Sequence, residues 1–294
     1  MDTLLNNKSD KYFWQKNLVI WLLALTTDYA IIAGAFYIAY IWGWIAYPFT
    51  LLFLGIAQHR LSVLGHEGVH GIISRNKHVN YWLAQLLCFW PLMTDIKSYR
   101  KFHSEHHRHA GIEYSDPEFE LKHDRYHFPI TRKKLFSRFF LDLFGGSFAE
   151  FLEATVYFAK RDNPFWAPSF VIISAALTYF TGHFEFFVLF MLAKPTTFWA
   201  VFRLRIYTEH VDIEGTHRVH LSLWQKLLFS PHNIGIHWEH HNYPQIPFWQ
   251  LPKLRAQYKD EPIIRFSELL HRSEAREENK RNEVHSSSHS IEIV

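Results

Sequence analysis

The chain has 294 residues and a formal net charge of +3 at pH 7, and 18% of its residues are aromatic, including 11 tryptophans. So small a net charge gives no indication of a nucleic-acid partner, and none is expected. The single cysteine, Cys88, excludes an internal disulfide and a cysteine-based zinc site, and is expected to be a core residue.

The first apolar segment of the chain lies near its N-terminus. From Asn17 to Gln58 there is no Lys or Arg, and Asp28 is the only acid. The segment is long enough for two membrane crossings of about 20 residues each, which are predicted at residues 17–40 and 42–62. Between them, GWIAYP (Gly43–Pro48) supplies a turn that places Trp and Tyr at the membrane interface. A cleavable signal peptide would be shorter than this segment.

The central region is predicted to lie outside the membrane. Residues 59–80 are expected to extend the second crossing past the bilayer, with their histidines on one face. The apolar segment Tyr81–Leu92 is too short to span, so it indicates either an interfacial or re-entrant helix or a buried core helix. Residues 111–163 mix charged and aromatic side chains, as in amphipathic helices of a cytosolic cap.

A second apolar block runs from Phe165 to Phe202 and contains Glu185 and Lys194. An interruption at Thr181-Gly182 divides it into predicted crossings at 164–181 and 183–203. Residues 273–294 are polar, charged and rich in serine and histidine, so this tail is expected to be disordered.

The distribution of charge predicts the topology. All 31 Lys and Arg residues lie in 1–16, 59–163 or 194–294, away from both hairpin tips. By the positive-inside rule, both termini and the histidine-bearing segments are cytoplasmic. The prediction is one all-α integral membrane domain over residues 1–272, made of two transmembrane hairpins (four spans) and a cytosolic helical cap at 63–163 and 204–272. The alternative is a soluble α-helical enzyme with very hydrophobic core helices.

Histidines form the most specific pattern in the sequence. Nine of the 21 fall in four short clusters, HEGVH, HSEHH, YTEH and HWEHH. Histidines three or four residues apart on a helix project from one face. Random placement would give only roughly 0.1 copies of HxxHH, whereas this chain has two. The nine are His66, His70, His103, His106, His107, His210, His237, His240 and His241.

This pattern predicts a polyhistidine metal site. Imidazole suits iron, copper, zinc and nickel, and a zinc site needs only three or four protein ligands. Two metal ions that share nine imidazoles, at four or five each, account for the number. Five polar residues near these histidines are candidates to orient their ring N–H groups, with a solvated helix face as the alternative for the glutamates. They are Glu67, Glu105, Glu209, Asn233 and Glu239.

The order HxxxH, HxxHH, a long gap and HxxHH, on a four-crossing scaffold, resembles the integral-membrane fatty acid desaturase and hydroxylase superfamily. RKFHSEHHRHAG with the following Asp116-Pro117-Glu118 resembles its second-box region, and Ser230–Pro252 resembles the third. The resemblance covers Leu61 to Pro252. It implies a non-haem di-iron centre that activates O2 and abstracts hydrogen from an unactivated C–H bond.

Carried over to this sequence, the resemblance implies that the eight box histidines are iron ligands. His210 matches an extra ligand that desaturases place after the fourth crossing. One position departs from the pattern: acyl-CoA desaturases carry an Asn that holds one iron through water, and this chain has Ile206 there. Glu209, Asn233 or a water is expected in its place, unless the coordination differs.

The sequence thus predicts a fatty acyl desaturase that binds its lipid substrate in an apolar tunnel and uses two iron ions and O2. Electrons must come from a separate donor of the ferredoxin or cytochrome b5 type, because the chain has no flavin, nucleotide, haem or iron–sulfur signature. A hydroxylase or carotenoid ketolase of the same superfamily would share every histidine box. A non-enzymatic metal-binding membrane protein, such as a metal carrier, would be expected to place its ionisable ligands inside the spans.

Overall fold

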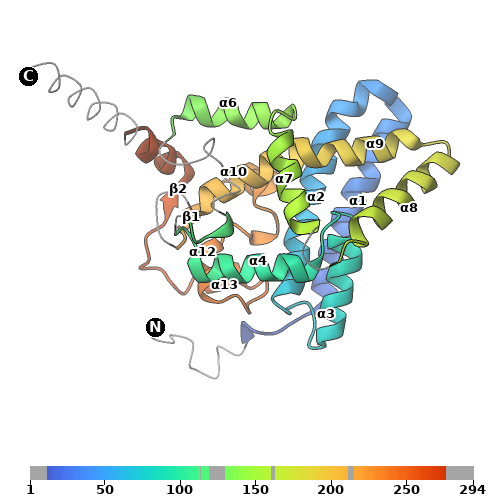
Figure 1. Ribbon diagram of the computed structural model, residues 1–294. Helices are drawn as coiled ribbons and strands as arrows, with labels where there is room; N and C mark the ends of the chain where they lie inside the picture. Colours follow the sequence, from blue (N-terminus) through green and yellow to red (C-terminus); the bar gives the residue numbers. More distant parts are fainter. Residues whose placement is uncertain (1–11, 113, 119–129, 160–162, 211–214, 276–294) are drawn as a thin grey trace, which may run out of the picture.

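The computed structural model describes residues 12–112, 114–118, 130–159, 163–210 and 215–275, and most of these are helical. Long helices, among them α1, α2, α8 and α9, gather at one end of the molecule in Figure 1. Shorter helices and loops, including α12, α13 and a pair of very short strands, form the other end. The molecule therefore separates into a long-helix end and a loop-rich end.

An N-terminal helical hairpin forms the first part of the long-helix end. Helix α1 (Leu18–Trp42) begins after Asn17, whose side chain accepts hydrogen bonds from two N–H groups of the first turn. Gly43 ends it with a φ of 58°, and the 3₁₀ turn η2 (Gly43–Ala46) leads into α2 (Tyr47–Val69). The absence of lysine and arginine from this segment predicted the hairpin, and both helices begin within five residues of the predicted limits.

The two helices pack along their length. The Trp21 indole is fully buried and donates a hydrogen bond of 3.2 Å to the carbonyl oxygen of Leu64. Leu54 and Leu61, both with no exposed surface, belong to the same core. Burial of such side chains contributes about 1.5–3 kcal/mol each, so one end of α2 is firmly held against α1 where its histidines begin.

Helix α2 extends beyond residue 62, as predicted, but ends earlier than the predicted residue 80. Gly71 adopts a φ of 70°, and the N–H of Ile72 bonds back to the carbonyl oxygen of Glu67 at 3.0 Å. This left-handed glycine terminates the helix. The next helix, α3 (Lys77–Ala84), starts after the N-cap Asn76.

Helix α3 continues into the π-helical turn η3 (Gln85–Phe89) and packs closely on α2. A Cβ atom at Gly68 would lie only 2.3 Å from that of Ala84, so only glycine permits this approach. Cys88 is buried with no exposed surface, which confirms its predicted place in the core. Trp82 is 48% exposed, so this apolar helix buries one face and leaves the other uncovered.

The second apolar block forms α8 (Trp166–Phe180) and one longer helical stretch made of α9 (Phe184–Ala193), the π-helical turn η4 (Lys194–Phe198) and α10 (Trp199–His210). Two stretches of the described chain are long and apolar enough to cross a membrane, Leu18–Val69 and Phe184–His210. Helix α8 has 15 residues, which corresponds to a length of roughly 22 Å. It is therefore shorter than the hydrocarbon core of a typical membrane, which is about 30 Å thick.

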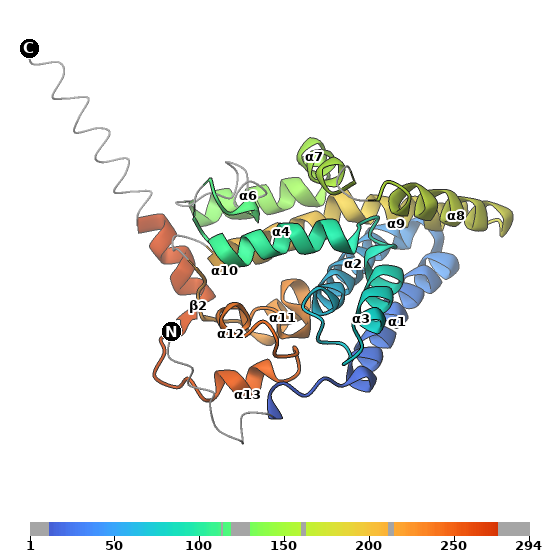
Figure 2. The same cartoon turned by 60° about the horizontal axis from the view of Figure 1, so that its bottom comes forward.

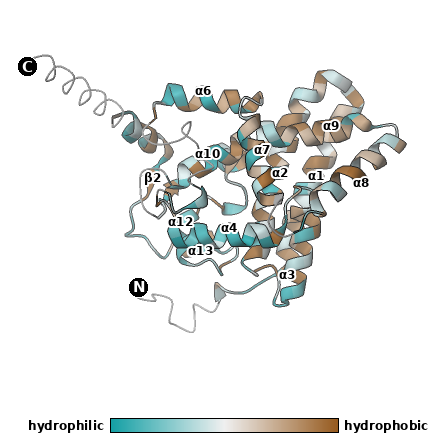
Figure 3. Ribbon diagram, viewed as in Figure 1, coloured by the Kyte–Doolittle hydropathy of each residue, from teal (hydrophilic) through white to brown (hydrophobic). Residues whose placement is uncertain are grey.

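The remaining elements carry most of the polar residues. They are α4 (Ile96–His109), α6 (Arg132–Leu143), α7 (Phe148–Ala159), β1 (Val219–His220), α11 (Leu223–Phe229), η5 (Pro231–Asn233), α12 (His237–Asn242), α13 (Leu251–Arg255) and β2 (Ile264–Arg265). Figure 3 shows hydrophilic residues concentrated on α4, α12 and α13, and hydrophobic ones on α2, α8 and α9. The polar end of the molecule is therefore the end that holds the third histidine box.

Two details depart from the sequence prediction. Strands β1 and β2 form a parallel pair of two residues each, too short to leave an alternating pattern in the sequence of a helical protein. Ser273, assigned to the tail, is buried, and its hydroxyl donates to the carbonyl oxygen of Ile130. The rest of that tail, from residue 276, lies outside the described residues.

A polar link joins the first helix to the loop before the third box. The carboxylate of Asp28, on α1, lies 2.5 Å from Arg60 Nε and 2.7 Å from His232 Nε2. His232 and its neighbour Asn233 both adopt positive φ angles, 49° and 57°. The link therefore fixes a strained turn four residues before His237.

Candidate metal centre

Four helices deliver the nine histidines. His66 and His70 lie at the end of α2, and α4 carries the second box. His210 is the last residue of α10, and α12 carries the third box. The rings of His106 on α4 and His210 at the end of α10 have centroids 4.6 Å apart, and α12 lies close to both helices in Figure 2. The helical spacing turns the histidines of each box toward this common region.

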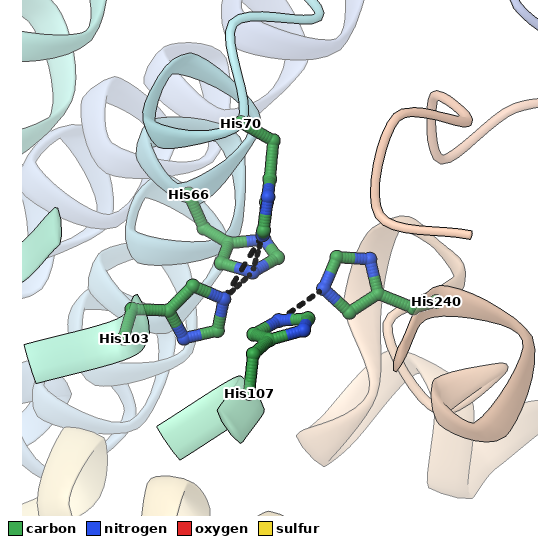
Figure 4. A group of neighbouring side chains, drawn as sticks. All are labelled: His66, His70, His103, His107 and His240. Atoms are coloured by element: carbon green, nitrogen blue, oxygen red, sulfur yellow. Dashed lines mark hydrogen bonds between the residues drawn. The ribbon is translucent and has the colours of Figure 1, made fainter. Parts of the chain in front are cut away.

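The first group contains five histidines, with side-chain nitrogens that all lie within 4.8 Å of one another. Their rings point toward one another from α2, α4 and α12 (Figure 4). His103 Nε2 lies 2.7 Å from His66 Nε2 and 2.9 Å from His70 Nε2. His240 Nε2 is 3.2 Å from His107 Nε2. Five imidazoles from three separate helices therefore surround one point.

The second group contains the other four histidines, again within 4.8 Å: His106, His210, His237 and His241. His210 Nε2 lies 2.9 Å from His237 Nε2, and His241 Nε2 lies 3.1 Å from His106 Nε2. The ring of His241 also stacks on that of His107 in the first group, with centroids 4.1 Å apart. The two groups are thus immediate neighbours, and the nine histidines divide five and four.

The chemistry of this donor set fits transition-metal ions. Burial lowers the pKa of His103, His237 and His240 well below its usual value, so these imidazoles are neutral at physiological pH. A neutral imidazole offers a lone pair to a metal. Nitrogens as close as these cannot all satisfy one another, because each contact needs one donor and one acceptor. A bound cation in each group would satisfy several lone pairs at once.

Asp116 orients one of these rings, and the sequence prediction had not named it as a site residue. Its carboxylate accepts hydrogen bonds from His106 Nδ1 and from the backbone N–H groups of Gly111 and Glu118, each at 2.8 Å. Burial disfavours the charged ring, but the carboxylates of Glu118 and Asp116 outweigh it and raise the pKa of His106. This contact leaves Nε2 of His106 facing the second group.

Replacing Asp116 with asparagine is expected to weaken metal binding by about 10- to 100-fold, the usual effect of losing a carboxylate behind a ligand histidine. Titration of the metal-loaded protein with a chelator would measure it. Glu105→Gln is the matched control, because the Glu105 carboxylate is 44% exposed and pairs with Arg108. Equal metal retention by both variants would show that Asp116 does not support the centre.

Two of the five proposed orienting residues are buried on the helices that carry His66 and His210. The Glu209 carboxylate is 3.4 Å from His237 Nε2 and accepts hydrogen bonds of 2.9 Å from Arg205 Nε. Glu67 is buried and accepts a hydrogen bond of 3.3 Å from the N–H of Phe248. Of these, Glu209 directly contacts a histidine ring.

The other three make different contacts. Glu105 faces outward toward Arg108. The Asn233 amide donates to the carbonyl oxygen of Phe248 at 3.0 Å, and Glu239 is buried in an ion-pair cluster with Arg218 and Arg255. Of the residues expected to compensate for Ile206, the structure brings Glu209 and not Asn233 to the histidines.

These features define a class of protein: a largely helical chain with membrane-length apolar helices and a largely buried centre of nine histidines. The family model for fatty acid desaturases matches residues 42–266, which is more than half of the chain. The protein therefore belongs to the fatty acid desaturase family, whose members are membrane-associated oxidoreductases. The predicted family is confirmed.

Several curated proteins are similar at low identity. A dihydrorhizobitoxine desaturase from Bradyrhizobium elkanii is 26% identical over 83% of this chain and 76% of its own length. A zeaxanthin 4-ketolase from Chlamydomonas reinhardtii is 26% identical over 66% of this chain and 41% of its own. An sn-1 acyl-lipid omega-3 desaturase (ferredoxin) from Synechocystis is 30% identical over 40% of this chain and 32% of its own. The chain thus spans less than half the length of the last two relatives.

Proposed function

We propose that this protein is an O2-dependent, di-iron membrane oxidoreductase that introduces a double bond into an acyl chain. The observation that carries the proposal is the division of nine histidines, six buried and three half-buried, into adjacent groups of five and four. Two iron ions held by these groups would activate O2, the oxidant that removes two hydrogens from the acyl chain and, with two electrons from the donor, is reduced to water. Membership of the desaturase family and the similarity to several desaturases support this reaction.

The residues around the first group are suited to position an apolar chain. The Tyr99 ring stacks on His103, with centroids 5.6 Å apart and planes 9° apart. Tyr99 also lines a cavity of about 80 Å³ whose walls include Phe89, Phe102 and Phe198. Aromatic walls next to the histidines would exclude water and hold one carbon in place, and such positioning can account for much of a rate enhancement.

Two measurements test the proposed reaction. Protein purified under iron-replete conditions should contain about two irons per chain, since each histidine group suits one ion. Expression in a host that lacks the activity, followed by lipid analysis, should show a new unsaturated acyl chain. One zinc per chain and no iron would contradict the di-iron centre, whereas two irons without a new lipid would contradict only the substrate.

Ketolation or hydroxylation is the second candidate. The similarity to a zeaxanthin 4-ketolase over 66% of this chain favours it, and it would use the same histidines. Feeding a carotenoid and a fatty acid to the same host separates the reactions by their products. In either case we propose a separate electron donor of the ferredoxin or cytochrome b5 type, in line with the ferredoxin named for one relative.

We further propose that the chain crosses the membrane four times, with its termini and histidines in the cytoplasm. Cysteine labelling can test this, because native Cys88 is buried. Trp44→Cys, at a side chain that is 77% exposed in the η2 turn, should react with an impermeant maleimide on intact cells. Lys133→Cys on α6 should react only after permeabilisation. Labelling of both sites from outside would contradict the topology.

A further inference from the structure

Lys194 is a cation in an otherwise apolar part of the chain. It begins η4, within the membrane-length stretch Phe184–His210, and is only 6% exposed. Its ammonium donates to the carbonyl oxygen of Leu92 and lies 5.8 Å from the centre of the Phe151 ring. Ionisable residues inside membrane segments are costly, and where they occur they mark substrate or ion pathways.

Lys194 differs from the buried arginines of the described chain, because no carboxylate of a described residue lies within salt-bridge distance of it. Each buried arginine has such a partner. The pairs are Arg203 with Asp142 at 3.6 Å, Arg205 with Glu209 at 2.9 Å and Arg218 with Glu239 at 2.8 Å. A buried charge is expensive unless it is paired. The fold therefore neutralises its other buried cations and leaves this one for another anion.

The cavity beside the first histidine group is the space next to this ammonium. Lys194 is its only charged lining residue, and Tyr99, stacked on His103, lines the same cavity. Four hydroxyl-bearing residues also line it: Tyr99, and three whose hydroxyl groups already donate to backbone carbonyl oxygens, Ser62, Thr94 and Thr155. An ammonium has three donors, and one of them is used by Leu92. The indole N–H of Trp199, also in the lining, is a donor without a partner among the described residues. Lys194 is distinguished from it by charge, since it is the only lining residue that can be positively charged.

We propose that Lys194 binds the carboxylate of the substrate, so that the substrate is a free acid and not a neutral lipid or a carotenoid. This rests on the proposed function, in that the cavity holds part of the substrate. Apart from Lys194 and the hydroxyl-bearing residues, its lining is mainly apolar and includes Phe89, Phe102 and Phe158. A carboxylate with an apolar chain attached matches this lining, because the anion can pair with the ammonium while the chain contacts the aromatic walls.

The test compares a fatty acid with its uncharged ester. Binding of stearate and methyl stearate to the purified, iron-loaded protein should favour stearate. Lys194→Met should weaken stearate binding by about 30-fold or more, since one partner of a buried charge pair is lost, and should change methyl stearate binding by less than about twofold. Lys194→Arg should retain the preference, because it keeps the charge. Lys226→Met, at an exposed lysine on α11, is the control.

Other results would overturn the proposal. If Lys194→Met weakened the binding of both ligands equally, the role of Lys194 would be to support the cavity wall through Leu92. If it changed the binding of neither ligand, Lys194 would have no role in binding. If the methionine variant does not fold, Lys194→Gln keeps a donor for Leu92 without the charge. Equal affinity of the unmodified protein for both ligands is decisive without any variant. Because binding is measured without turnover, failure here is distinguishable from failure of the desaturase reaction, which iron content and products report.

Discussion

Replacing His240 with alanine is expected to reduce oxidation by more than about 100-fold, beyond the usual loss from a residue that only supports a ligand. His240 is 1% exposed, and its ring centroid lies 4.6 Å from that of His66 and 5.0 Å from that of His107. It is the member of the first group that comes from the C-terminal part of the chain. Its loss leaves four imidazoles from α2 and α4 and opens one side of the site. Product formation and iron content of the purified variant measure the effect.

The control for this variant is His78→Ala, at an exposed histidine on α3 outside both groups. It should match the unmodified protein in iron content and product. Because both variants lose one imidazole, any difference between them belongs to the metal centre. Oxidation by His240→Ala at the control's rate would show that the third box does not complete the first group.

His210→Ala is expected to lower iron content from about two to about one per chain and to abolish activity. His210 is the only candidate ligand outside a multi-histidine box, and the alternative role for a lone histidine is that of a surface residue. The structure places it 1% exposed, with Nε2 2.9 Å from His237 Nε2 and Nδ1 donating to the carbonyl oxygen of Gly215 at 2.8 Å. Removal of one of the four imidazoles leaves three ligands in the second group, and we expect three to bind an iron ion much more weakly than four.

Iron analysis of His210→Ala, together with product analysis, decides between the two roles. His220→Ala is a suitable control, because that histidine is exposed on β1. Full iron content with near-normal turnover in His210→Ala would mean that eight histidines suffice. Full iron content with no turnover would give His210 a role in the reaction without a role in holding metal.

Local patterns explain why much of the fold could be predicted. The segment from Asn17 to Gln58 has no lysine or arginine, which identifies α1 and α2, and Gly43 marks the turn between them. Helical spacing within each box likewise predicts that its histidines share a face. Both inferences depend on residues close together in sequence. The helices of the second apolar block, Phe165–Phe202, were harder to predict. Helix α8 is only 15 residues long, and the π-helical turn η4 interrupts the helical stretch that follows.

Contacts between distant segments could not be predicted in the same way. The spacing of Glu105 beside His103 suggested an orienting role, but its side chain faces outward, since residues two apart on a helix lie on different faces. Asp116 follows a turn after α4, and only that turn returns its carboxylate to His106. The general rule that ligand histidines have carboxylate partners was the signal that could have identified it. The choice of Arg218 as the partner of Glu239 also depends on the fold.

The origin of the histidines has a consequence for biosynthesis. Each group combines rings from the first half of the chain with rings from α12, near its C-terminal end. A ribosome has therefore made and released the whole N-terminal hairpin before it produces His240 and His241. A nascent chain that ends before α12 has four of five imidazoles in one group and two of four in the other. A metal ion would therefore bind with full affinity only after α12 has been synthesised, and its binding would then close the long connection between α4 and α12.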